Sequence, residues 1–119
     1  MRKIKFRAKD RETGEWVYSG KFGLAEFFYG IEDGQLDGET LGEYIGLPDK
    51  NGKEIYEGDW LKWSDNFFKI IYDTFNGCWY GEPHIDNPFI GILTARSFPK
   101  SEIIGNIYQD SHLLDKSEV

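Results

Sequence analysis

The chain has 119 residues, a formal net charge of −7 and an aromatic content of 17%. This length suffices for one folded domain without a metal, and the single cysteine, Cys78, cannot form an intramolecular disulfide. The acidic balance argues against a general affinity for nucleic-acid backbones, which attract basic surfaces. No apolar run approaches the roughly 20 residues that span a bilayer, and no signal-peptide pattern is visible. We therefore expect a cytoplasmic protein with no membrane contact.

The charge is distributed unevenly along the chain. Residues 1–11 contain six bases and one acid, whereas the remaining residues contain eight bases and twenty acids. The N-terminal segment therefore carries a formal charge of +5, and the rest of the chain carries −12. This asymmetry makes the N-terminal segment the part of the chain most suited to an acidic partner.

The N-terminal segment MRKIKFRAKD alternates between apolar and basic side chains, as a half-buried strand requires. One face is predicted to carry Ile4, Phe6 and Ala8. The other face is predicted to carry a basic stripe, defined as Lys3, Lys5, Arg7 and Lys9. These four cations are the candidate contact residues, because they can bind phosphates. They can equally pair with carboxylates of this chain or a second copy, or protect an edge strand from aggregation.

The next segments predict a hairpin and then a less regular region. Residues 10–14, DRETG, supply a glycine where a hairpin loop needs a positive φ, and residues 15–22 resume a strand pattern. Residues 24–40 predict a short helical turn or an irregular strand, followed by an acidic loop in solvent. We expect a single domain over residues 1–119, with an N-terminal β subregion at 1–43.

The remainder, residues 44–119, predicts a barrel-like subregion made of short strands and tight turns. Asn51-Gly52 and Asn76-Gly77 are hairpin signals, because both residue types tolerate positive φ. Strands are expected at 44–47, 54–56, 60–63, 67–75, 78–81, 90–93 and 101–108. Gly105 marks a bulge in the last strand, and Ser111 is expected to cap a final helical turn.

The segment PDKNGKEIYEGD contains several oxygen donors, but its spacing does not match a calcium loop. An EF-hand loop needs Gly at position six and Glu at position twelve. Counted from Asp49, Gly52 is fourth and Trp60 is twelfth. We therefore interpret the segment as a structural hairpin with solvated charges and expect no metal or other cofactor.

The sequence contains no recognisable catalytic constellation. His84 and His112 are far apart and have no companion ligands at metal-binding spacing. Cys78 lies in a predicted strand, and we expect it to be a small buried hydrophobe and not a nucleophile. Acids that are close in sequence, such as Glu54 and Glu57, have no evident cause of desolvation. The protein is therefore predicted not to be an enzyme.

Three segments together resemble the YopX family of phage and prophage proteins. They are the opening MRKIKFRAKDRETGEWVY, the central YIGLPDKNGKEIYEGDWLKW and the closing EIIGNIYQDSHLL. Mild departures from the family pattern occur at Lys9, Ile45, Gln109, Ser111 and His112. The resemblance implies an all-β fold of small, strongly bent antiparallel sheets, with an SH3-like barrel portion and few short helical turns. It also implies an origin in a phage or prophage, and it carries over no catalytic or ligand-binding residues.

Two functions follow as expectations. The first is a non-enzymatic module that acts in the bacterial cytoplasm through a protein partner or through self-association. The alternative is a small-barrel protein that binds single-stranded nucleic acid through Lys3, Lys5, Arg7 and Lys9, although the net charge disfavours it. A carboxylate-based hydrolase is a third hypothesis, which requires a pocket that holds a desolvated acid.

Overall fold

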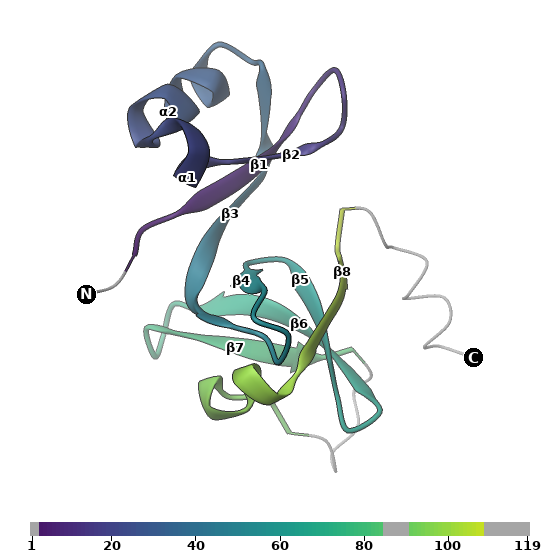
Figure 1. The fold of residues 1–119 in the computed structure, drawn as a ribbon. Helices are drawn as coiled ribbons and strands as arrows, with labels where there is room; N and C mark the ends of the chain where they lie inside the picture. Colours follow the sequence, from purple (N-terminus) through teal and green to yellow (C-terminus); the bar gives the residue numbers. More distant parts are fainter. Residues whose placement is uncertain (1–2, 85–90, 109–119) are drawn as a thin grey trace. The chain divides into compact units, whose positions relative to one another are not determined.

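The computed structural model describes residues 3–84 and 91–108. It consists mainly of strands in two antiparallel sheets, one of which is curled into a half-barrel, with a few short helices (Figure 1). The predicted all-β class is therefore confirmed. The chain divides into two compact units, Met1–Gly46 and Leu47–Val119. Among the described residues, no helix combines the length and apolar character needed to cross a membrane.

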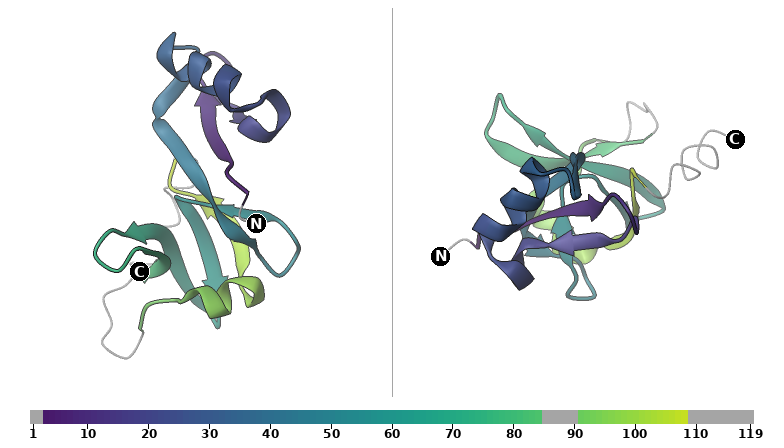
Figure 2. Two further views of the ribbon diagram at one scale, coloured as in Figure 1. Left: turned by 90° about the vertical axis from the view of Figure 1, so that its left-hand side faces the viewer. Right: turned by 90° about the horizontal axis from the view of Figure 1, so that it is seen from above.

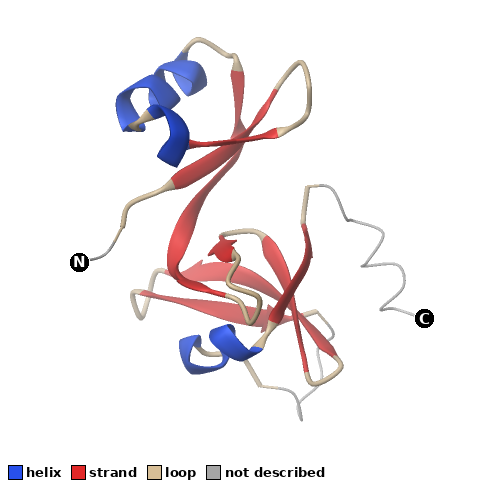
Figure 3. Ribbon diagram, in the orientation of Figure 1, coloured by secondary structure: helices blue, strands red, loops and turns tan. Residues whose placement is uncertain are grey.

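The first sheet has the strand order β2-β1-β3-β4. Its strands are β1 (Phe6–Asp10), β2 (Trp16–Tyr18), β3 (Leu36–Pro48) and β4 (Glu54–Tyr56). Two helices, α1 (Ser19–Phe22) and α2 (Leu24–Glu32), lie between β2 and β3 in the sequence. Figure 3 shows both helices in blue beside the strands of the first unit.

The predicted hairpin at residues 10–14 is confirmed. Gly14 has φ of 73°, and its N–H donates to the Asp10 carbonyl at 2.9 Å. The Asp10 carboxylate accepts the N–H groups of Glu12 at 2.8 Å and Thr13 at 3.1 Å. A turn of this kind combines a side chain that bonds its own backbone with a glycine in the left-handed region.

The strand predicted for residues 15–22 is wrong in its second half. β2 ends at Tyr18, and Ser19 begins α1. The buried Ser19 hydroxyl accepts the N–H of Phe6 at 2.9 Å. This side chain satisfies a backbone donor of β1 where the β2 pairing stops, so a tertiary contact determines where the strand ends.

The predicted acidic loop within residues 24–40 is also wrong. After α2 the chain enters β3, which pairs with β1 through a register shift between Arg7 and Lys9. The Thr40 hydroxyl accepts the N–H of Lys9 at 2.8 Å and donates to the Asp37 carbonyl at 2.6 Å. Acidic residues are therefore tolerated here because an irregular strand exposes some side chains while its backbone stays bonded.

The core of the first unit lies between α2 and the sheet. Its buried members are Ala8, Phe27 and Leu36, and the partly buried Phe6, Val17, Ile31 and Leu41 pack against them. The predicted apolar face of the first strand is only partly correct. Ile4 precedes β1 and is 61% exposed, whereas Ala8 is buried.

The second sheet has the order β7-β6-β5-β8. Its strands are β5 (Asp59–Trp63), β6 (Asn66–Asp73), β7 (Cys78–Pro83) and β8 (Glu102–Asn106), and a 3-10 helix, η1 (Ala95–Lys100), precedes β8. Figure 2 shows these strands from two further directions, with their strong twist visible. The core is formed by Ile55, Tyr56, Trp60, Leu61, Phe68, Ile70, Leu93 and Phe98.

Several turn predictions in the second unit are confirmed. Gly52 and Gly77 adopt φ of 81° and 69° in the turns predicted from their Asn-Gly pairs. The register of β5 against β8 shifts between Trp60, opposite Gly105, and Leu61, opposite Ile103, which is the bulge expected near Gly105.

Other predictions in the second unit differ from the structure or lie outside it. Cys78 is exposed, so its assignment as a buried hydrophobe is wrong. Within the predicted strand 90–93, Leu93 forms only an isolated bridge with Gly81, and residue 90 lies outside the described residues. The helical turn expected after Ser111, and His112 within it, also lie outside them.

Candidate functional site

Two residues of the basic stripe, Arg7 and Lys9, lie on β1, and Lys3 and Lys5 precede it. The strand register shows which side chains share a face. Lys9 is opposite Trp16, and Arg7 is opposite Tyr18. Directly opposite residues in antiparallel strands project to the same side of a sheet. The face opposite the α2-covered core therefore combines cations with aromatic rings.

Three cations of this face lie over rings. The Arg7 guanidinium carbon is 4.1 Å from the centroid of the Trp16 ring, and the Lys9 ammonium is 5.4 Å from the same centroid. The Lys5 ammonium is 5.6 Å from the centroid of the Tyr44 ring. These five residues form what we call the cation–aromatic face. A cation over an aromatic ring is attracted by the negative face of the π-system.

The four residues of the basic stripe are not equivalent. Lys3 precedes β1 and is exposed, whereas Lys5 and Lys9 are half-buried. Arg7 is only 5% exposed. Moving Arg7 off the Trp16 ring would forfeit a contact worth up to about 2 kcal/mol when desolvated. Its guanidinium therefore has a structural role in the hairpin that Lys3 does not share.

Sequence reasoning missed the aromatic members of this face. A usable signal was present for Trp16, because the confirmed DRETG loop fixes the hairpin register and thereby places Trp16 opposite Lys9. No comparable signal existed for Tyr44. It lies in β3, far along the sequence, where its N–H donates to the Lys5 carbonyl at 2.8 Å.

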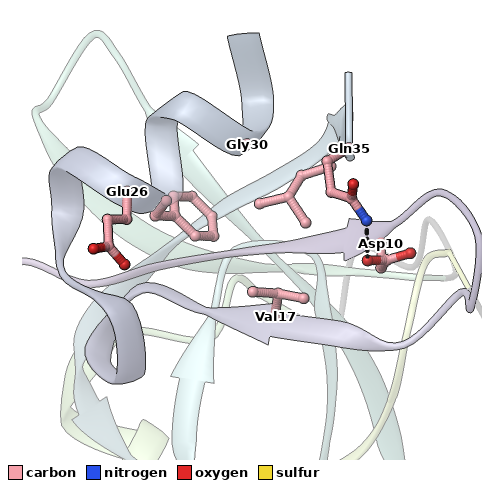
Figure 4. A pocket seen from close by; sticks show the side chains of 7 residues that line it. Asp10, Val17, Glu26, Gly30 and Gln35 are labelled. Carbon is pink, nitrogen blue, oxygen red and sulfur yellow. Dashed lines mark hydrogen bonds between the residues drawn. The ribbon is translucent and has the colours of Figure 1, made fainter. Parts of the chain in front are cut away.

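A second feature of the first unit is a shallow groove of about 270 Å³ beside α2. It is lined by Asp10, Val17, Glu26, Phe27, Gly30, Gln35 and Leu36. Figure 4 shows Glu26 at one end of the groove and Asp10 with Gln35 at the other, with Val17 between them. A Cβ added at Gly30 would lie 3.0 Å from Leu36 Cδ1, so glycine lets α2 approach the floor of the groove closely.

The Asp10 carboxylate at the end of this groove is held in its ionised form. The side-chain amide of Gln35 donates to it at 3.0 Å and is the main cause of its lowered pKa. The backbone N–H groups of Thr13 and Glu12 lower the pKa of Asp10 further, against a small opposing effect of burial. Asp10 is therefore a fixed negative charge at neutral pH.

A third feature is a set of exposed apolar side chains on α2. Leu24, Phe28 and Tyr29 are 42%, 38% and 71% exposed, and we call these three residues the α2 apolar surface. Phe28 is also fixed in position, because its ring packs edge-on against Phe6 at 5.2 Å and Phe27 at 5.3 Å between centroids. Rigid exposed aromatic groups are typical of surfaces that bind proteins.

Comparison with known protein families identifies the chain. The model of the YopX protein family matches residues 5–115, which include most of the opening, central and closing segments of the sequence. The chain belongs to the YopX family. A comparison with curated proteins finds no match.

In this YopX-family chain the central segment is a structural element. The Asp49 carboxylate accepts the N–H groups of Asn51 at 2.8 Å and Lys53 at 2.9 Å through Oδ1, and that of Ile103 at 3.0 Å through Oδ2. Asp49 is 3% exposed, and Asp59 is 2% exposed. The expectation that the charges of this segment are solvated is therefore wrong for both residues.

Burial alone would raise the pKa of Asp49 in the YopX-family chain. The N–H groups of Ile103, Lys53 and Asn51, followed by the charge of Lys53, outweigh this effect, so the pKa is lowered from 3.8. Asp49 is thus an ionised acceptor that fastens a turn to β8. A general acid would instead need a raised pKa.

The histidine that can be placed, His84, packs its ring edge-on against Trp60 with centroids 5.4 Å apart. Within residues 3–84 and 91–108, no group of three or more His, Cys, Asp or Glu side chains is arranged to hold a metal ion. The interaction features of the YopX-family chain are thus the cation–aromatic face, the groove and the α2 apolar surface.

Proposed function

We propose that this YopX-family chain is a non-enzymatic phage or prophage protein that acts through protein contacts in the bacterial cytoplasm. The observation that carries the proposal is the α2 apolar surface. A nine-residue helix buries one large side chain, Phe27, yet exposes Leu24, Phe28 and Tyr29. The partner that best fits this surface is a second copy of the chain, because a two-fold axis places the same helix against itself and covers both surfaces together.

Three carboxylates, those of Asp10, Asp49 and Asp73, support a role without catalysis. The pKa values of Asp10, Asp49 and Asp73 are all lowered, and in each case hydrogen bonds from the surrounding turn contribute. A lowered pKa favours a permanent anion, whereas a hydrolase that uses a pair of carboxyl groups needs one with a raised pKa to act as general acid. These acids therefore fit the stabilisation of turns better than acid–base chemistry.

The self-association proposal predicts a mass that rises with protein concentration. Tyr29→Ser is expected to raise the dimer dissociation constant about tenfold or more, because exposed aromatic anchors contribute most of the energy at interfaces. Sedimentation velocity at low and high salt measures this effect. The matched control is Phe75→Ser, which removes a ring that is 96% exposed on the β6–β7 turn in the other unit.

Two outcomes would refute self-association through α2. One is a monomeric mass for the unmodified protein at every protein and salt concentration. The other is an equal loss of association in the Tyr29 and Phe75 variants, which would indicate non-specific stickiness. Thermal unfolding followed by circular dichroism checks that Tyr29→Ser leaves the fold intact, as expected for a side chain that is 71% exposed.

The alternative function is binding of single-stranded nucleic acid, and the cation–aromatic face favours it. Proteins of that class combine cations with rings on which bases stack. Trp16 and Tyr44 are such rings, although Lys5, Arg7 and Lys9 already lie over them. The net charge of −7 works against this function, so any binding should be weak and strongly dependent on salt.

Charge reversal tests the alternative. The triple variant Lys3→Glu, Lys5→Glu and Lys9→Glu is expected to abolish binding to a fluorescent oligothymidine at low salt, as measured by anisotropy. The control variant reverses three exposed lysines elsewhere, Lys21, Lys62 and Lys100, and changes the net charge equally. Absence of binding by the unmodified protein at low salt, or equal losses in both variants, would eliminate this function.

A further inference from the structure

The groove beside α2 is lined by residues that play no part in the self-association proposed above. Its apolar floor, as we call this part of the lining, consists of Val17, Phe27 and Leu36. Figure 4 shows the carboxylates of Asp10 and Glu26 at its two ends. In the part of the chain that the structure describes, neither carboxylate forms an ion pair with a base of the protein. The nearest arginine in sequence, Arg11, pairs instead with Asp37 at 3.6 Å.

The groove has a negative charge at each end and an apolar floor, and these two properties determine which ligand would fit it. A phosphate or a carboxylate would be repelled by both ends. A purely apolar group would fit the floor but leave the charges without compensation. An alkyl chain that ends in an ammonium or guanidinium group satisfies both parts, because such side chains bury their methylene groups and keep the charged end near polar groups.

We infer that this groove binds a lysine or arginine side chain of the protein that covers α2. The inference rests on the proposed role in protein contacts. It adds that the partner presents a cationic side chain next to its apolar contact. The source is assigned to a protein because Glu26 of the groove is a helix-surface neighbour of Tyr29, three residues further along α2, whose ring is 71% exposed. A partner lying along α2 would therefore reach both.

The two carboxylates contribute differently. Asp10 is fixed by Gln35, Thr13 and Glu12, so its charge is preorganised and costs no side-chain entropy on binding. Glu26 is exposed and has freedom to adjust its position to the cation. The Asp10 end of the groove thus provides the fixed orientation, and Glu26 provides the adaptable contact.

The test is an NMR titration of the full chain with lysine capped at both ends as the probe. We expect shifts of the backbone N–H signals of Gly30 and Leu36 and of the Gln35 side-chain amide. Capped norleucine, which has a similar alkyl chain without the charge, should leave these signals in place. Glu26→Gln should weaken the response to capped lysine roughly two- to fivefold, as expected for a partly solvated charge pair.

Glu32→Gln is the matched control, because Glu32 is an exposed acid of α2 that does not line the groove. On titration with capped lysine, the N–H signals of Glu32→Gln should shift as much as those of the unmodified protein. Unchanged spectra with capped lysine, equal shifts with norleucine, or no effect of Glu26→Gln would overturn the inference. A stronger response to cadaverine than to capped lysine would assign the groove to a free diamine and overturn the protein source.

This titration measures binding in the groove independently of self-association. Capped lysine needs no second copy, so binding by a protein that sediments as a monomer would refute only the choice of partner. Conversely, self-association without binding of the probe would refute only the cationic contact. Failure of the proposed function and failure of this inference are therefore distinguishable.

Discussion

Replacing Asp49 with alanine is expected to lower the free energy of unfolding by about 2–4 kcal/mol. The carboxylate accepts three backbone N–H groups, those of Asn51, Lys53 and Ile103, in a site where Asp49 is 3% exposed. Each buried donor that loses its acceptor costs about 1–3 kcal/mol, and water can replace part of the loss at the exposed turn. Urea denaturation followed by tryptophan fluorescence measures the change.

Asp73→Ala is the matched control for this prediction. Asp73 also accepts three hydrogen bonds in a turn, from the N–H groups of Phe75 and Asn76 and from the Asn76 side chain. These contacts are exposed to solvent, so water replaces the lost acceptor and the expected loss of stability is well below that of Asp49→Ala. Equal losses in the two variants would contradict the argument that burial makes Asp49 important.

The same contacts predict how acid affects the protein. Because hydrogen bonds hold the folded-state pKa of Asp49 below 3.8, its contribution is fully present above the unfolded value. That contribution is lost as the pH falls through the folded pKa, where the carboxylate becomes protonated. Unfolding of Asp49→Ala should therefore depend less on pH in this acidic range than unfolding of the unmodified protein. Parallel pH profiles would contradict the assignment.

Gly81→Ala is expected to cost about 2–3 kcal/mol through overpacking. A Cβ at this position would lie 2.8 Å from Leu93 Cβ and 2.9 Å from Phe68 Cβ. Both atoms are attached directly to the backbone, so a rotamer change cannot relieve the contact. The Leu93 segment is also held close by two hydrogen bonds, Gly81 N–H to Leu93 carbonyl at 2.7 Å and the reverse at 2.9 Å.

Gly91→Ala is the control for Gly81, because within residues 3–84 and 91–108 a Cβ there would have no heavy atom within 4 Å apart from its chain neighbours. The control is expected to change stability by less than about 0.5 kcal/mol. Urea denaturation again provides the measurement. If Gly81→Ala proved as stable as Gly91→Ala, β7 and the Leu93 segment would have to separate more easily than their paired hydrogen bonds indicate.

Local turn chemistry explains which parts of the fold were predictable. The DRETG loop, the two Asn-Gly turns and the bulge at Gly105 could be predicted because each depends on the backbone preferences of a few adjacent residues. α2 was predicted only as a helical turn or an irregular strand. Its nine residues include six apolar ones and Gly30, so the segment lacks the broad polar face that identifies an amphipathic helix.

Side-chain environments were harder to predict than backbone turns. Asp49 looked like a solvated loop residue because its third donor, the N–H of Ile103, is 54 positions away in the sequence. Cys78 was expected to be buried because it lies in a strand, but it occupies the first position of β7 beside an exposed turn. The groove was not predictable, because its lining residues are contributed by β1, β2, α2, the turn after α2 and the start of β3.

The sequence by itself determined the all-β class, the YopX resemblance, the confirmed turns and the alternation that gives β1 a cationic face. Each of these depends on residue types at short spacing. Only the tertiary structure decided that Arg7 is buried against Trp16, that Asp49 anchors a turn to β8, and that Asp10 and Glu26 share a groove. Burial and side-chain pairing depend on contacts between segments that are distant in the sequence, and short-range residue patterns carry no information about such contacts.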